Sequence, residues 1–152
     1  MSMLVHIHSI LRWLVLVTMV YAIFRAIRGK QSGVYEAADN QASLFAMISC
    51  DIQLLIGLVL YVAGPMGIKN IQENGMKFVM SNAVSRFFAV EHLSMMLLAI
   101  VLVHIGRARS KKGATDAAKH QAVFIFYTIA LVLILASIPW PFREAFAGRS
   151  WF

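Results

Sequence analysis

Five ionisable side chains lie inside long apolar runs of this sequence or at their edges, where charge is costly. His6, His8 and Arg12 belong to the first run, LVHIHSILRWLVLVTMVYAIF, and Glu91 and His92 lie at the start of the third, AVEHLSMMLLAIVL. An ionisable group within an apolar span costs about 3 kcal/mol or more and is therefore a candidate for function. Imidazole and carboxylate bind transition metals, and imidazole also ligates haem iron.

Helical periodicity assigns these side chains to faces. At about 100° per residue, His8 and Arg12 share one face, whereas His6 points about 160° away from His8 and is expected at the membrane interface. The face of His8 continues through Val15, Met19, Ala22 and Ala26. The face of His92 includes Phe88, Met96, Ala99, Val103 and Gly106. Along both faces the side chains become smaller with distance from the histidine. Small residues let helices or a flat ligand approach closely.

A haem between two helices would use this pattern. His8 and His92 each lie a few residues from the same end of their runs, so we expect them at similar depth. In an up-and-down bundle the first and third helices are diagonal, and two such histidines can supply both axial ligands of a haem. Arg12 would then face a haem propionate or Glu91. Glu91 points about 100° from His92, so it would pair with Arg12 or Arg86, or orient a ligand.

Other interpretations of the same residues stay open. A single histidine near the end of a span is more often interfacial than ligating. His6, His8, Glu91 and His92 could instead hold a Zn, Fe or Cu ion, which would require His6 to turn inward against its helical phase. The buried charges could also serve only to fix the register of the helices.

A second group of ionisable residues consists of Asp51, His104 and His120. Asp51 lies two turns inside the second apolar run, where it could relay protons or contact a quinone headgroup. His104 lies about 120° off the face of His92, so the sequence does not favour a second haem. His120 follows Lys119 and is expected at the lipid headgroups.

The composition predicts the elements that position these residues. Of the 152 residues, 60% are hydrophobic and 14% are charged, against roughly 45–50% and about 25% in soluble domains. A soluble domain of this length could not bury so much apolar surface. We expect one all-α transmembrane domain over residues 1–152, an antiparallel four-helix bundle. Its predicted spans cover about 4–27, 43–63, 84–107 and 118–138, with a short interfacial helix in the connection that follows the second span.

The charge pattern predicts an orientation. The formal net charge is +7, and without a basic stripe of interleaved aromatic residues we expect no nucleic acid as a partner. One side of the bundle carries eight basic residues: Arg25, Arg28, Lys30, Arg107, Arg109, Lys111, Lys112 and Lys119. The other carries five: Lys69, Lys77, Arg86, Arg143 and Arg149. The positive-inside rule then predicts that both termini lie outside the cytoplasmic membrane.

Five stretches carry a resemblance to a known family: HSILRWLVL, IQLLIGLVLY, the EH of AVEHLSMMLLAIVL, IGRARSKKGATDAAKH and IPWPF. The chain resembles short four-helix bacterial membrane proteins labelled "cytochrome B", and the resemblance covers nearly its whole length. It implies haem b and electron transfer. By motif, His8, Arg12, Glu91 and His92 are the positions that the family would use.

The sequence therefore favours a small haem-binding electron-transfer subunit of the lipid bilayer. Its expected partners are a quinone or a larger respiratory complex, and it could form a homo-oligomer. Two alternatives remain. One is a non-redox membrane protein that carries protons or ions through Asp51 and the histidines. The other is a structural or assembly subunit.

Overall fold

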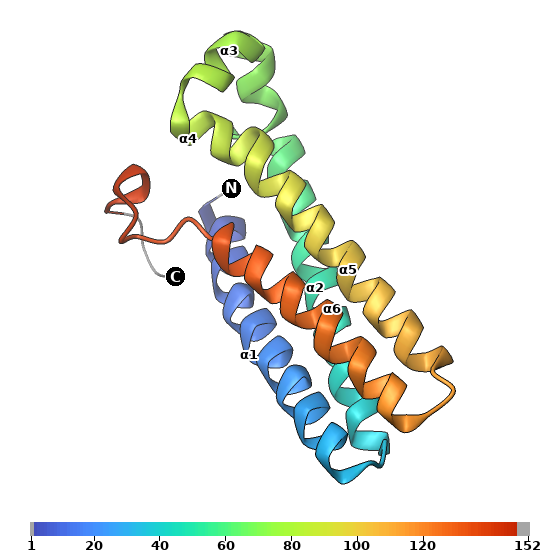
Figure 1. Cartoon of the computed structure of the whole chain (residues 1–152). Helices are drawn as coiled ribbons and strands as arrows, with labels where there is room; N and C mark the ends of the chain where they lie inside the picture. The colour runs from blue at the N-terminus through green and yellow to red at the C-terminus, as the bar shows by residue number, and fades with distance from the viewer. Residues whose placement is uncertain (1, 149–152) are drawn as a thin grey trace.

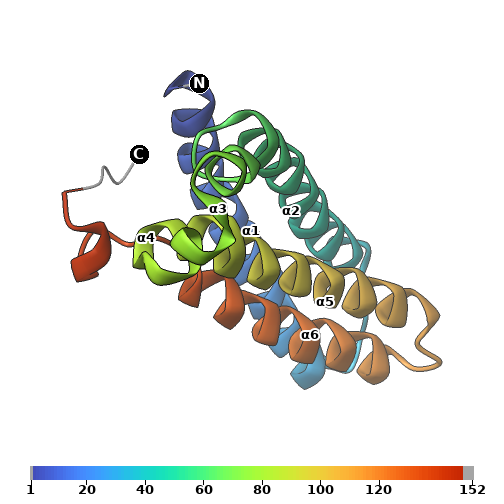
Figure 2. The same cartoon turned by 90° about the horizontal axis from the view of Figure 1, so that it is seen from above.

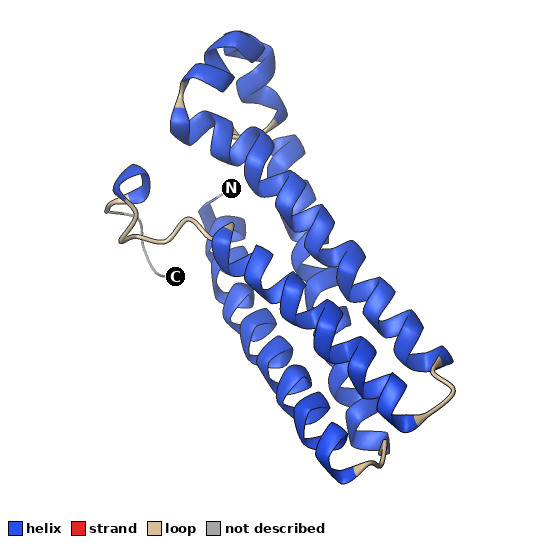
Figure 3. Cartoon of the chain, viewed as in Figure 1, coloured by secondary structure: helices blue, strands red, loops and turns tan. Residues whose placement is uncertain are grey.

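The computed structural model describes residues 2–148, and Arg149 lies outside this range. These residues form helices joined by short connections, and no strand occurs among them (Figures 1 and 3). The long helices are α1 (Ser2–Ser32), α2 (Ala37–Ala63), α5 (His92–Lys112) and α6 (Asp116–Ala136). The short α4 (Ala83–Arg86) and the π-helical turn η1 (Phe87–Glu91) run into α5, so that one helix extends over 83–112. The expected all-α antiparallel four-helix bundle is confirmed.

Four helices, including the combined helix 83–112, are long and apolar enough to cross a membrane. Large apolar side chains cover the outside of the bundle; Val17 and Leu55 are 65% and 64% exposed. A surface that faces lipid has this character. Apolar side chains cover it, and the backbone polar groups are hydrogen-bonded inside each helix. The chain is therefore a multi-pass membrane protein. The helices α1, α2 and 83–112 begin or end beyond the predicted spans, whereas α6 ends at Ala136, two residues before its predicted end.

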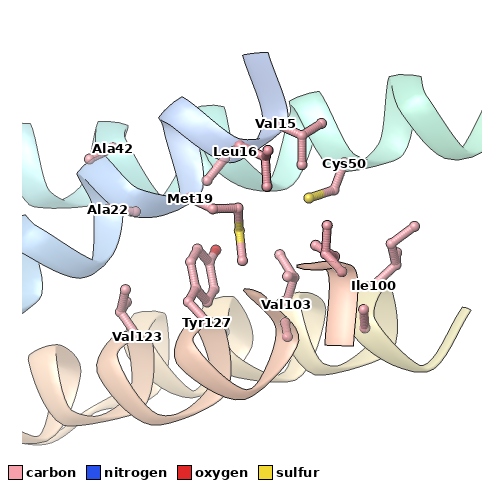
Figure 4. Close-up of a cluster of buried hydrophobic side chains, with 14 of the residues drawn as sticks. Val15, Leu16, Met19, Ala22, Ala42, Cys50, Ile100, Val103, Val123 and Tyr127 are labelled. Carbon is pink, nitrogen blue, oxygen red and sulfur yellow. The ribbon is translucent and has the colours of Figure 1, made fainter. Parts of the chain in front are cut away.

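The helices neighbour one another in the order α1, α2, α5, α6 around the bundle, and α6 packs back against α1. α1 and α5 are thus diagonal, as expected. The core of the bundle combines small residues, among them Ala22, Ala46, Ala99 and Ala130, with larger aliphatic ones. Met19 and Tyr127 are fully buried in it (Figure 4). Small side chains allow the close approach of helices in a membrane, where packing rather than water exclusion drives association.

The two ends of the bundle differ. At one end, α3 (Ile68–Ser81) joins α2 to α4, with a bend at Gly75, whose φ is 79° (Figures 1 and 2). We call it the α3 end; α1 begins and α6 finishes there. The predicted short helix after the second span is thus present. The other end, which we call the loop end, carries the connections 33–36 and 113–115. Thr115 caps α6 there, as its side chain accepts a hydrogen bond from Ala118 N.

Candidate functional site

A cavity of about 280 Å³ lies within the α3 end of the bundle, between α1, α2, α5 and the end of α6. Its walls are mostly aliphatic. The polar side chains that line it are His8, Ser9, Arg12, Gln53, Tyr61 and His92. The volume is near the lower limit of ligand pockets, about 300–1,000 Å³, and an apolar wall with a few convergent polar groups is typical of such sites.

The structure brings His8 and His92 together across the diagonal of the bundle. Their ring centroids are 6.4 Å apart, with 72° between the ring planes. His8 belongs to α1 and His92 begins α5, and both line the cavity. The two imidazoles therefore lie at one depth and face a shared space, although 84 positions separate them in the sequence.

His92 has a defined tautomer. Its Nδ1 lies 2.8 Å from the backbone oxygen of Ser137, at the end of α6. A carbonyl oxygen can only accept, so Nδ1 carries the hydrogen and donates it. The lone pair of the neutral ring is then on Nε2, the nitrogen left to bind a metal. Metal-binding histidines are commonly oriented by a hydrogen bond of this kind.

His8 is held mainly by α2. Gln53 Nε2 donates a hydrogen bond of 2.8 Å to the backbone oxygen of His8. Gly57 leaves room for the ring, because a Cβ there would lie 3.1 Å from His8 Cε1. Among the described residues, His8 Nδ1 and Gln53 Oε1 are buried polar atoms without a hydrogen-bond partner. Both residues line the cavity, so a polar group bound there could supply the missing hydrogen bonds.

A π-helical turn precedes His92. The backbone N–H of His92 bonds to the oxygen of Phe87, five residues earlier. This turn gives Phe87 a place beside the imidazole, with 5.7 Å between the ring centroids. Such turns often mark functional sites. A constant rotation of 100° per residue cannot predict this π-helical turn, and no residue pattern in the sequence indicates it.

Arg12 and Glu91, the other two predicted site residues, have different surroundings. Arg12 lines the cavity one helical turn from His8, and its guanidinium carbon lies 5.5 Å and 5.7 Å from the ring centroids of Trp13 and Trp140. Glu91 forms a 2.7 Å ion pair with Arg86, one of its two expected partners. The Glu91 side chain is 46% exposed and is not part of the cavity wall.

The donor set of the cavity fits a haem. An imidazole nitrogen binds a metal ion at about 2 Å, and the ring centroid lies about 1 Å behind it, so two imidazoles on opposite sides of one ion have centroids about 6 Å apart. The 6.4 Å between His8 and His92 matches this separation. Within residues 2–148 no three His, Cys, Asp or Glu side chains gather as a metal site. A haem requires fewer protein ligands than a bare ion, because its porphyrin supplies the rest.

The second predicted group is divided between two places. Asp51 and His104 pair with each other, with 2.8 Å between Oδ1 and Nε2, on the outside of the seam between α2 and α5. They do not line the cavity. The sequence alone did not predict this pairing, because the contact depends on the relative register of two helices.

The structure corrects the prediction that His120 is exposed at the lipid headgroups. Its side chain is not exposed at the end of the bundle: it is 1% exposed and buried among the helices at the loop end. Its Nε2 lies 2.9 Å from the oxygen of Val34, and its ring lies 4.9 Å from that of Tyr35. Gly29 on α1 makes this burial possible, since any Cβ there would overlap the imidazole. His120 thus joins α6 to the connection 33–36, and its Nε2 also lies 3.9 Å from Oδ2 of the buried Asp39 on α2.

Sequence reasoning also missed a polar cluster at the loop end. The buried Arg107 donates hydrogen bonds to Asn40 Oδ1 and Ser43 Oγ at 2.7 Å and 2.9 Å. Tyr127, fully buried, donates to the backbone oxygen of Ser43 at 2.8 Å. These bonds join α2, α5 and α6. The position of Arg107 at the end of an apolar run indicated only a basic flank.

Comparison of the chain with protein-family models, curated proteins and solved structures finds no match in any of the three.

Proposed function

We propose that this chain is a small b-type-cytochrome-like electron-transfer subunit that binds haem b between α1 and α5. The observation that carries the proposal is the pair His8 and His92, two imidazoles 6.4 Å apart that face one cavity from diagonal helices. The resemblance to bacterial membrane proteins labelled "cytochrome B" supports the same function. When bound, haem supplies reversible one-electron exchange.

Three polar residues of the cavity have a role in this proposal. His8 and His92 would be the axial ligands, and the Ser137 carbonyl would fix the His92 ring with Nε2 turned to the iron. Arg12 would balance the charge of a propionate. The aliphatic wall keeps water away, which is one way in which a protein sets a redox potential. Glu91 would act only indirectly, through its ion pair with Arg86.

The proposal includes a cellular setting. The excess of basic residues at the loop end favours a bacterial cytoplasmic membrane with the loop end inside and both termini outside. The haem would then lie near the outer face of the membrane. A quinone or a larger respiratory complex would exchange electrons with it. An activity reporter fused to the C-terminus and active only in the cytoplasm would contradict this orientation.

The absorption spectrum of the purified protein, oxidised and reduced, tests the function. Protein from cells that synthesise haem should show a Soret band and the reduced bands of a six-coordinate b-type haem. His92→Ala and His8→Ala should each lose haem or give a five-coordinate, high-spin spectrum.

Two histidines outside the cavity provide controls. His6→Ala removes an exposed imidazole two residues from His8, and His104→Ala removes one from α5. Neither should change the spectrum. Protein without a Soret band would refute the haem proposal and leave the proton-conducting or structural alternatives. A haem spectrum that depends on His104 or His120 but not on His8 would move the site to the other half of the bundle.

A further inference from the structure

The ion pair of Asp51 and His104 is not explained by the cavity. It joins α2 to α5 on the outer surface of the bundle, and the two side chains are 36% and 49% exposed. The proposed haem site uses neither residue. The question is what covers a carboxylate and an imidazole on a surface that otherwise faces lipid.

The depth of the pair makes this exposure unfavourable. Asp51 is the fifteenth residue of the 27-residue helix α2. The predicted second span begins at about residue 43, so at 1.5 Å per residue Asp51 lies about 12 Å inside that span, which is farther than an aspartate side chain reaches. Ionisable residues at such a depth almost always face protein or a water-filled cavity rather than lipid. Large apolar side chains on the same helical faces are also exposed: Leu55 on α2, and Leu97 and Val101 on α5.

The pair also has unused hydrogen-bonding capacity. Its single bond joins Asp51 Oδ1 to His104 Nε2. Within the described part of the chain, Asp51 Oδ2 and His104 Nδ1 make no hydrogen bond. Asp51 Oδ2 is a strong acceptor, and His104 Nδ1 is a donor when the ring is the imidazolium of an ion pair, with a proton on each nitrogen. The two groups lie side by side on the same face.

We propose that the α2–α5 face is the contact surface of a homodimer, in which Asp51 of each copy faces His104 of the other. Two copies inserted in the same direction are related by a two-fold axis along the membrane normal, so residues of equal depth meet. Asp51 and His104 are at equal depth because they bond to each other. The two-fold axis therefore places acceptor against donor twice and closes a ring of four side chains.

The α2–α5 seam suits this contact. α2 and α5 pack less closely than the other neighbouring helices of the bundle, so a second copy would cover the most loosely packed seam. The cavity does not extend to Asp51 or His104. A partner surface therefore fits the pair better than a small lipid-soluble ligand, which would need a pocket there.

Disulfide cross-linking of the full chain in membranes tests the dimer. The native Cys50 is buried and is first replaced by Ala. Leu55→Cys then introduces a thiol one turn from Asp51, and Val17→Cys introduces one of equal exposure on α1. Mild oxidation should cross-link the Leu55→Cys protein into a dimer of twice the monomer mass, and the Val17→Cys protein should stay monomeric. Equal cross-linking of both variants, or of neither, would overturn the proposal.

A charge-exchange experiment tests the reciprocal pairing. In the Leu55→Cys background, Asp51→His gives two imidazoles at the contact and His104→Asp gives two carboxylates, so each variant alone should cross-link several-fold less. Co-expression of the two variants should restore the cross-link, because each chain then offers what the other lacks. Co-expression without recovery, while each single variant remains helical and monodisperse, would refute the pairing. A cross-link only to a chain of different mass would refute the second copy as occupant. Neither experiment depends on haem.

Discussion

Gly57 offers a test of the His8 site from the neighbouring helix α2. In Gly57→Ala, the new Cβ would lie 3.1 Å from His8 Cε1, whereas ordinary contacts lie at 3.4–4 Å. The ring must therefore retreat by a few tenths of an ångström. Metal–ligand distances vary by only about 0.2 Å in functional sites, so a displacement of this size should weaken ligation by His8. Glycine-to-alanine changes inside a helix stabilise it by about 0.5–1 kcal/mol, so lost ligation could not be attributed to a weaker α2.

The assay is the haem content and spin state of purified Gly57→Ala, read from absorption spectra. We expect a larger high-spin fraction and faster loss of haem to an acceptor protein, with helix content unchanged. Gly57→Leu should have the larger effect. Val59→Ala, a change at an exposed position of the same helix, is the control and should leave the spectrum as it was. A normal low-spin spectrum in both Gly57 variants would refute the placement of the His8 ring against Gly57 in the loaded protein.

Three further substitutions give distinct results. Arg12→Leu should keep both imidazoles but weaken haem retention and shift the midpoint potential, measured by redox titration, whereas Arg12→Lys should lie nearer the parent; equal potentials in all three proteins would contradict a propionate contact. Glu91→Gln should leave the spectrum unchanged, because its ion pair is exposed and such pairs contribute about 1 kcal/mol or less. Tyr127→Phe removes a buried interhelical hydrogen bond and should lower the free energy of unfolding by about 1 kcal/mol in detergent titrations. Tyr21→Phe, at an exposed position, is its control, and an equal loss there would contradict the assignment.

Most of the fold could be predicted because the signals that define a membrane bundle are local. A run of about 20 apolar residues identifies each span, and Thr115 marks the start of α6 through its cap. Short connections then require antiparallel neighbours and a diagonal α1 and α5. The proximity of His8 and His92 follows from this topology together with their equal distance from the span ends. Their role as haem ligands stays a prediction.

The remaining features depend on contacts between helices, which a single helix does not encode. Lys119 beside His120 indicated the headgroups, but the space left by Gly29 on another helix decides that His120 is buried. The hydrogen bond between Asp51 and His104 depends on the relative axial position of α2 and α5. The π-helical turn before His92 is stabilised by packing around Phe87, including Phe146 from the C-terminal segment at 4.5 Å.

The end of α6 acts as an electrostatic component of the cavity. The helix stops before Pro139, so its last carbonyls lack backbone donors. Side chains donate to them instead. Trp140 donates to the carbonyl of Leu135, Arg143 to that of Ala136, and His92 to that of Ser137. The aligned peptide dipoles give this end about half a negative charge. His92 therefore points its N–H at the negative pole of a neighbouring helix, which makes the opposite nitrogen a stronger electron donor. Lengthening α6 by one residue before Pro139 would turn its terminal carbonyl by about 100° around the helix axis, and would remove the acceptor of His92 without changing any residue of the cavity wall.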